Sequence, residues 1–127
     1  MRWHHKTVRV VNRTRRTLVG ERIRVAETGL KRFVGLLGER DLLPGDGLLI
    51  VPSQGVHTWG MLFPIDIAVL DHDWKVIAIW RDMRPFRMTR IRWKAAAVLE
   101  LPVGTLGLTS TVEGDTIGFD GVDVAPR

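Results

Sequence analysis

Residues 56–71 read VHTWGMLFPIDIAVLD, and this stretch decides the predicted fold. A polar pair, His57 and Thr58, precedes a bulky apolar run, and Asp66 stands at the entrance of a strand predicted over Ile67–Leu70. A carboxylate at that entrance must reach water or accept hydrogen bonds, because an unpaired buried charge is costly. Hydrogen bonds from the backbone or from Thr58 would give Asp66 a structural role at the start of a hairpin.

The chain around this stretch predicts further short strands and one helix. Alternating or continuous apolar residues predict the strands Val8–Asn12, Thr17–Ala26, Leu48–Val51, Ile67–Asp71, Lys75–Trp80, Ala95–Pro102 and Thr116–Phe119. Apolar residues three and four apart predict an amphipathic helix over Thr28–Leu37. Crossover helices between strands are missing, which disfavours a doubly wound parallel sheet. We therefore expect an α+β, mostly β fold, with a curved or barrel-like, mainly antiparallel sheet of about seven or eight short strands and one short covering helix.

Length and composition predict a single domain over residues 1–127, with a basic N-terminal strand region at 1–16 and a short tail at 120–127. The chain has no cysteine, which excludes disulfides, thiolate metal sites and cysteine nucleophiles. Neither a signal peptide nor an apolar run of the ~20 residues that a membrane span needs is visible. We expect a cytoplasmic protein without a membrane span, a monomer or weak homodimer, that holds no cofactor or metal.

The formal net charge of +5 is spread unevenly along the chain. Residues 1–24 carry a net +7 and residues 81–94 a net +5, whereas residues 25–80 carry −3 and residues 95–127 carry −4. Two interpretations follow. The basic and acidic blocks neutralise each other across the folded surface, or a basic block forms a patch for phosphate, nucleic acid or an acidic partner.

Four blocks of sequence stand in a characteristic order. They are RFVGLL at 32–37, PGDGLLI at 44–50, HTWGMLFPIDI at 57–67, and VLELPVG at 98–104 with Gly114–Asp115 behind it. Together they resemble the domain of unknown function 192 family, also called uncharacterised protein family 0127, over about residues 17–119. The resemblance implies a small, mostly β domain with no established biochemical activity. The polar positions that carry over are Arg32, His57, Thr58, Asp66, Glu100 and Asp115.

The favoured functional hypothesis is a binding module with an Arg/His-lined pocket for a small anionic ligand or a protein segment. Its candidate ligand-binding residues are Arg32, His57, Thr58, Asp66 and Glu100. Strand alternation turns Glu100 away from Leu99 and Leu101. Glu100 could pair with Arg32 or with an arginine of the 84–92 segment, and such an ion pair favours a scaffold role over catalysis.

Two other functions stay open. Single-stranded nucleic acid could bind the basic and aromatic residues of segment 84–94, namely Arg84, Phe86, Arg87, Arg90, Arg92 and Trp93. A hydrolase or metal-dependent enzyme could use His57, Asp66 and Glu100, although their spacing matches no recognised metal-ligand motif. The catalytic residues of such an enzyme are not apparent from the sequence, and we favour binding over catalysis.

Overall fold

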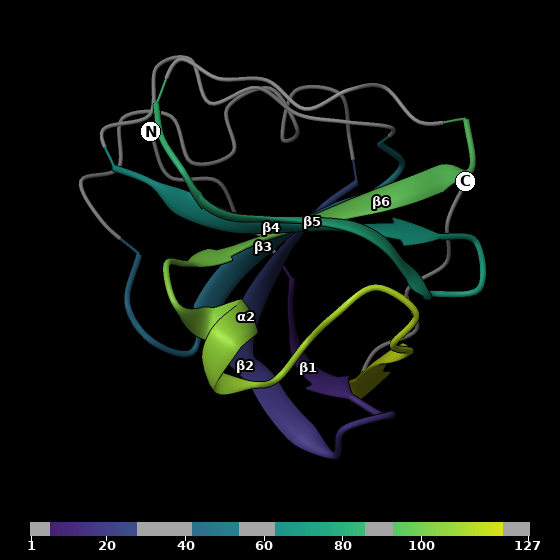
Figure 1. The fold of residues 1–127 in the computed structure, drawn as a ribbon, viewed down its shortest axis with the longest axis horizontal. Coiled ribbons are helices and arrows are strands. Elements are labelled where there is room, and N and C mark those ends of the chain that lie inside the picture. Colours follow the sequence, from purple (N-terminus) through teal and green to yellow (C-terminus); the bar gives the residue numbers. More distant parts are fainter. Residues whose placement is uncertain (1–5, 28–41, 54–62, 86–92, 121–127) are drawn as a thin grey trace.

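The computed structural model describes residues 6–27, 42–53, 63–85 and 93–120, and its main feature is one curled sheet of seven strands (Figure 1). The strand order is β5-β4-β6-β3-β2-β1-β7, and the sheet curls into a half-barrel. The strands are β1 (Thr7–Asn12), β2 (Thr17–Ala26), β3 (Asp46–Ile50), β4 (Ile65–Asp71), β5 (Val76–Met83), β6 (Ala95–Pro102) and β7 (Ile117–Asp120). Among them only β2 and β3 pair in parallel. The mostly β, mainly antiparallel curved sheet predicted from the sequence is confirmed.

Each strand that the hydrophobic pattern predicts is present, with ends shifted by a few residues. The helix predicted over Thr28–Leu37 lies outside the described residues. The helix that the structure describes is α2 (Thr105–Leu108), a single turn after β6. The predicted hairpin turn between β4 and β5 is held by Asp71, whose Oδ1 accepts hydrogen bonds from the backbone N–H groups of Asp73 and Lys75 at 2.9 Å each.

The curl of the sheet brings its two edge strands together at one end. A backbone bridge joins Lys75 to Thr116, and the N–H of Val76 donates to the carbonyl of Asp115 at 2.8 Å. The rings of Trp74 and Phe119 also pack edge to face, with centroids 4.6 Å apart. These contacts tie the start of β5 to β7, so that the half-barrel is partly closed.

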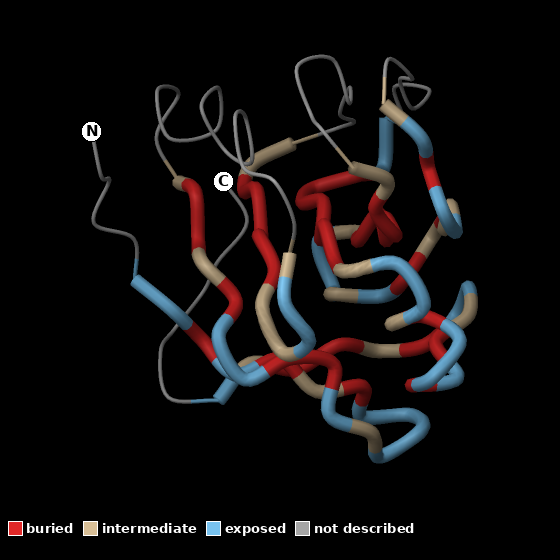
Figure 2. Tube along the Cα trace, turned by 90° about the vertical axis from the view of Figure 1, so that its left-hand side faces the viewer, coloured by how far each residue is buried: buried red, intermediate tan, exposed pale blue. Residues whose placement is uncertain are grey.

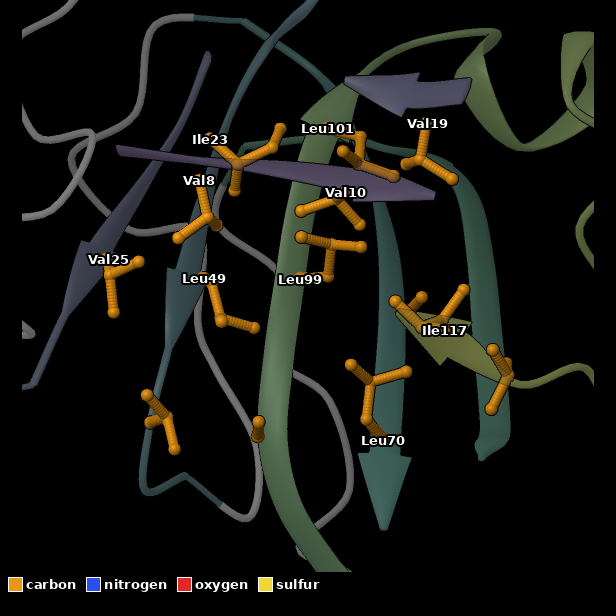
Figure 3. Packing of buried hydrophobic residues seen from close by; sticks show 14 of the residues in the cluster. Val8, Val10, Val19, Ile23, Val25, Leu49, Leu70, Leu99, Leu101 and Ile117 are labelled. Atoms are coloured by element: carbon orange, nitrogen blue, oxygen red, sulfur yellow. The ribbon is translucent and has the colours of Figure 1, made fainter. Parts of the chain in front are cut away.

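Apolar side chains cover both faces of the sheet. The inner face, which points into the half-barrel, carries the larger cluster, shown in Figure 3 between β1 and β2 on one side and β4 and β6 on the other. The outer face carries a second cluster that includes Leu48, Ile67 and Val98. In Figure 2 the buried positions follow the strands, whereas the exposed positions concentrate at the turns. Within the described parts of the chain, no helix is long and apolar enough to cross a membrane.

Candidate functional site

A hollow of about 470 Å³ lies against the β1–β2 hairpin, and three arginine side chains line it. Its lining residues are Arg9, Val11, Asn12, Arg13, Arg16, Thr17 and Leu18. We call this feature the arginine hollow. It brings together basic residues of the N-terminal block that the sequence analysis left without a specific role.

Strand alternation explains how β1 builds one side of the arginine hollow. Val8 and Val10 are buried in the inner cluster, which turns Arg9 and Val11 to the outer face. Leu18 of β2 lies opposite Val11 in the antiparallel register and is 39% exposed. The hollow therefore has an apolar strip between its charged side chains.

The turn between β1 and β2 supplies the other two arginines. Arg13 follows β1 directly, and Arg16 has a positive φ of 59°, the left-handed conformation of a tight turn. Arg13 extends over β7, where Gly118 leaves room for it, because a Cβ at position 118 would overlap the Arg13 guanidinium. The position of the Arg13 charge thus depends on a glycine more than 100 residues away in the sequence.

One carboxylate, Asp120 at the end of β7, faces these arginines. Its Oδ2 lies 3.1 Å from Arg9 Nη1, and its Oδ1 lies 4.0 Å from Arg13 Nη2. Arg16 has no hydrogen-bond or ion-pair partner among the residues that the structure describes. Among the described residues, the three lining arginines and Asp120 sum to a formal charge of +2.

A buried network of hydrogen bonds joins the turn between β1 and β2 to Thr111 and Asp115. Asn12 Nδ2 donates to Thr111 Oγ1 and to Asp115 Oδ2, both at 3.0 Å, and Arg15 Nε donates to Asp115 Oδ2 at 3.1 Å. The Asn12 Oδ1 in turn accepts from the backbone N–H of Arg15 at 3.0 Å. Burial of Asp115 favours its neutral form, but the hydrogen bonds from Asn12, Arg15 and the Val112 N–H outweigh burial and lower the pKa of its carboxyl. The turn that carries Arg13 and Arg16 is therefore fixed to the rest of the molecule.

Several other basic residues outside the arginine hollow are paired with acids. Ion pairs join Lys6 to Glu27, Arg22 to Asp46 at 2.8 Å, and Arg15 to Asp115 at 3.1 Å. These pairs join basic residues of the N-terminal block to acids of later blocks, as the neutralisation interpretation predicts. The arginine hollow differs from them because it gathers three cations around one acid.

Asp66 is the first of the sequence-predicted residues that the structure describes. It is 1% exposed, its Oδ1 accepts from the Asp82 N–H at 2.9 Å, and its Oδ2 accepts from the N–H groups of Gly104 and Leu106 at 3.1 and 3.0 Å. Gly104 has a positive φ of 94°, which suits the sharp turn into α2. The carboxylate thus ties β4 to β5 and to the start of α2 through backbone donors, the structural role that the sequence suggested.

Glu100 is the second described residue of the predicted set. It is 4% exposed on the outer face of β6, opposite Leu48 of β3 and Ile67 of β4. Burial raises the pKa of the Glu100 carboxyl to about 8, while the positive charge of Arg24 acts in the opposite direction. Arg24 is on β2, where it pairs in register with Leu48 of β3, and it therefore lies two strands away from Glu100. Among the described residues, the cation that acts on Glu100 is Arg24, which was not one of the predicted partners. The predicted partners Arg32, Arg87, Arg90 and Arg92 lie outside the described residues.

The two described carboxyl groups lie on opposite faces of the sheet. Asp66 pairs in register with Leu101 of the inner cluster, whereas Glu100 pairs with Ile67 of the outer cluster. A ligand that contacts one of them from its own face of the sheet does not reach the other. The remaining predicted ligand residues, Arg32, His57 and Thr58, lie outside the described residues. Within the described ranges, no three His, Asp or Glu residues are grouped as a metal site would require.

The segment proposed for nucleic acid is described only at its two ends. Arg84 Nη2 lies 3.7 Å from Asp82 Oδ2, and Trp93 is 89% exposed. The residues between them on which that hypothesis rests, Phe86, Arg87, Arg90 and Arg92, lie outside the described residues.

Only part of the arginine hollow could be predicted from the sequence. The repetition of Arg9, Val11 and Arg13 at alternate positions places these side chains on one face, and that local signal is visible in the sequence. Asp120 and Gly118 join them only because β7 pairs with β1. No local sequence pattern predicts that pairing.

A model of the DUF192 family, described as uncharacterized ACR, matches residues 10–119. The chain belongs to the DUF192 family. The matched range runs from within β1 to within β7, so that it includes most of the arginine hollow as well as Asp66 and Glu100. The resemblance of the four sequence blocks to this family is confirmed, and the family itself is described as uncharacterised.

Curated relatives agree with the DUF192 assignment, and two solved structures share the fold. A UPF0127 protein of Thermococcus sibiricus is 29% identical over 119 residues, which cover 87% of this chain and 74% of the relative. The crystal structure of a protein of unknown function from Novosphingobium aromaticivorans superposes with a TM-score of 0.76 at 20% identity, covering 90% of this chain and 84% of that one. A structure from Sinorhizobium meliloti, named a "putative transcription regulator", gives a TM-score of 0.77 at 19% identity and covers 96% and 100% of the two chains. At these identities the two structures show a shared fold.

Proposed function

We propose that this DUF192 protein is a binding module that accepts a small anion in the arginine hollow. The observation that carries the proposal is that Arg9, Arg13 and Arg16 line one hollow, while the described carboxylate beside it, Asp120, pairs only with Arg9 and Arg13. A guanidinium presents several N–H donors in a planar fork that matches the oxygens of carboxylates and phosphates. The local charge of +2 leaves donors that Asp120 alone does not saturate.

The turn that carries Arg13 and Arg16 is held in place without a ligand. Asn12 and Asp115 hold the hairpin turn through buried hydrogen bonds, and Gly118 leaves room for Arg13 over β7. Groups that are already in place lose less conformational entropy on binding. The side chains of Arg9 and Arg13 are 52% and 56% exposed, so water screens each contact and the affinity for a simple anion is expected to be modest.

The lining of the arginine hollow suits binding better than catalysis. None of the described lining residues is a His, Ser, Asp or Glu that could act as a nucleophile or a general base, and Asp120, which faces the hollow, is paired with Arg9. The hydroxyl of Thr17 already donates to the carbonyl of Thr109 at 2.8 Å. Asp66 is likewise engaged by three backbone donors on the inner face.

Isothermal titration with sodium phosphate at constant low ionic strength tests this proposal. We expect saturable binding to the wild-type protein, and a loss of affinity of about fivefold or more in Arg16→Ala, since one charge-assisted contact is removed. Arg81→Ala is the matched control, because Arg81 is an exposed arginine of β5 and does not line the hollow. Absence of saturable phosphate binding, or an equal loss in both variants, would refute the proposal.

A further inference from the structure

The arginine hollow has an apolar strip that a bare inorganic anion would leave unused. Val11 is half-buried, and Leu18 opposite it is 39% exposed. Both lie among the three arginines that line the hollow. Leu18 is one of few large apolar side chains that stay exposed among the described residues, and its surface would be covered by an apolar group on the ligand.

The charge of the arginine hollow limits which anions fit. Arg9, Arg13 and Arg16 against Asp120 leave +2, which a dianion neutralises and a monoanion does not. A phosphate monoester is close to a dianion at neutral pH, since its second pKa is about 6, whereas a carboxylate or a sulfonate carries one charge. A monoester also leaves three terminal oxygens for the guanidinium groups, and its ester oxygen leads to the organic group.

Resting on the proposed function, we infer that the arginine hollow selects the dianion of a phosphate monoester whose ester group is apolar. The terminal oxygens contact Arg16 and compete with Asp120 for Arg9 and Arg13. The apolar ester group lies on the strip formed by Val11 and Leu18. Asp120 then acts as an internal anion that holds two of the arginines in the free protein and keeps the net charge at +2.

Three ligands separate charge from apolar contact: phenyl phosphate, inorganic phosphate and benzenesulfonate. At pH 7.5 we expect phenyl phosphate to bind about five- to tenfold tighter than benzenesulfonate, which has the same ring and one charge fewer. We expect phenyl phosphate to bind about three- to tenfold tighter than inorganic phosphate, which lacks the ring. Equal affinity of phenyl phosphate with either of the other two ligands overturns the inference.

A pH series at constant ionic strength gives a second readout of the charge requirement. The groups that face the ligand are Arg9 and Arg13 from β1, Arg16 from the turn and Asp120 from β7, while Thr17 and Leu18 of β2 do not titrate. Between pH 7.5 and pH 5 phenyl phosphate loses its second charge, so that its advantage over benzenesulfonate should disappear. Benzenesulfonate keeps one charge over this range and serves as the reference ligand. An advantage that persists at pH 5 overturns the inference.

Two substitutions complete the test. Leu18→Ser should make the affinity for phenyl phosphate equal to that for inorganic phosphate, without changing the affinity for inorganic phosphate. Leu43→Ser is the matched control, because Leu43 precedes β3, is 58% exposed and does not line the hollow. Asp120→Asn should raise the affinity for inorganic phosphate by about three- to tenfold, because a competing carboxylate is removed. If inorganic phosphate binds but Leu18→Ser leaves the advantage intact, the inference fails while the proposed function stands. If no anion binds the wild-type protein, the proposed function itself fails.

Discussion

Arg13 lies across Gly118 of the neighbouring strand β7, and its guanidinium occupies the volume that a Cβ at position 118 would take. This close approach fixes where the Arg13 charge stands relative to Asp120. The relationship links the end of the chain to its beginning, because β7 reaches the arginine hollow only through its pairing with β1.

Gly118→Ala is expected to displace Arg13 and to weaken phosphate binding by about three- to tenfold, since one of the three cations leaves its position. The fold should survive, because the three atoms nearest to the new Cβ all belong to the flexible side chain of Arg13. Gly107→Ala is the control, since a Cβ there would meet no atom within 4 Å. Calorimetric titration of both variants measures the effect. Unchanged affinity in Gly118→Ala would show that the position of Arg13 does not matter for the site.

Asp66→Asn is expected to lower the free energy of unfolding by about 3 kcal/mol. The new amide NH2 would face a backbone N–H group whose hydrogen bond the carboxylate accepts in the wild type. Urea denaturation followed by circular dichroism measures this change. Asp73→Asn provides the comparison, since Asp73 is an exposed acid in the β4–β5 turn. Equal stability of the two variants would remove the structural role assigned to Asp66.

Glu100 should make the protein less stable as the pH rises. The folded carboxyl has a pKa raised to about 8, so that between its unfolded value of 4.5 and about 8 the folded state holds a proton that the unfolded state releases. Stability therefore falls with increasing pH in that window, by at most about 1.4 kcal/mol per pH unit from this group. Residue 100 stays neutral in Glu100→Gln, so the free energy of unfolding of this variant relative to the wild type should rise from pH 5 to pH 8, as measured by urea denaturation. Parallel profiles for the two proteins would contradict the raised pKa.

Asp115 should have the opposite pH dependence. Its pKa is lowered in the folded state, so its contribution is present above the unfolded pKa of 3.8 and is lost as the pH falls through the lower folded value. Asp115→Asn should cost about 2 kcal/mol of unfolding free energy at pH 7, because hydrogen bonds from Asn12 and Arg15 are weakened. The cost should shrink below pH 4, as measured by thermal or urea unfolding. A cost that stays constant down to pH 2 would mean that ionisation of Asp115 is not its source.

Most of the fold could be predicted because its signals are local. The stretch around Asp66 combines a polar entrance with an apolar run, and the turn at Asp71 separates two runs of strand residues. Alternation also gave the face on which Glu100 lies, away from Leu99 and Leu101. Each of these features depends on residues close together in the chain.

The partners of these residues could not be predicted, because they arise from pairings far apart in the sequence. Two of the donors to Asp66, Gly104 and Leu106, lie 38 and 40 residues away. Arg24 acts on Glu100 only because β3 lies between β2 and β6. The contacts of Arg9 and Arg13 with Asp120 and Gly118 depend on the pairing of β1 with β7, whose residues are separated by more than 100 positions. Hydrophobic alternation predicts strands, but it does not give their order in the sheet.

The most direct test of the central claim is an NMR titration with inorganic phosphate that follows the backbone amides and the arginine Nε–Hε groups. The account predicts saturable shifts of Arg9, Arg13 and Arg16 and of the adjoining turn, with a common dissociation constant. Shifts that do not saturate, or that concentrate at residues away from the β1–β2 hairpin, would contradict anion binding in the arginine hollow.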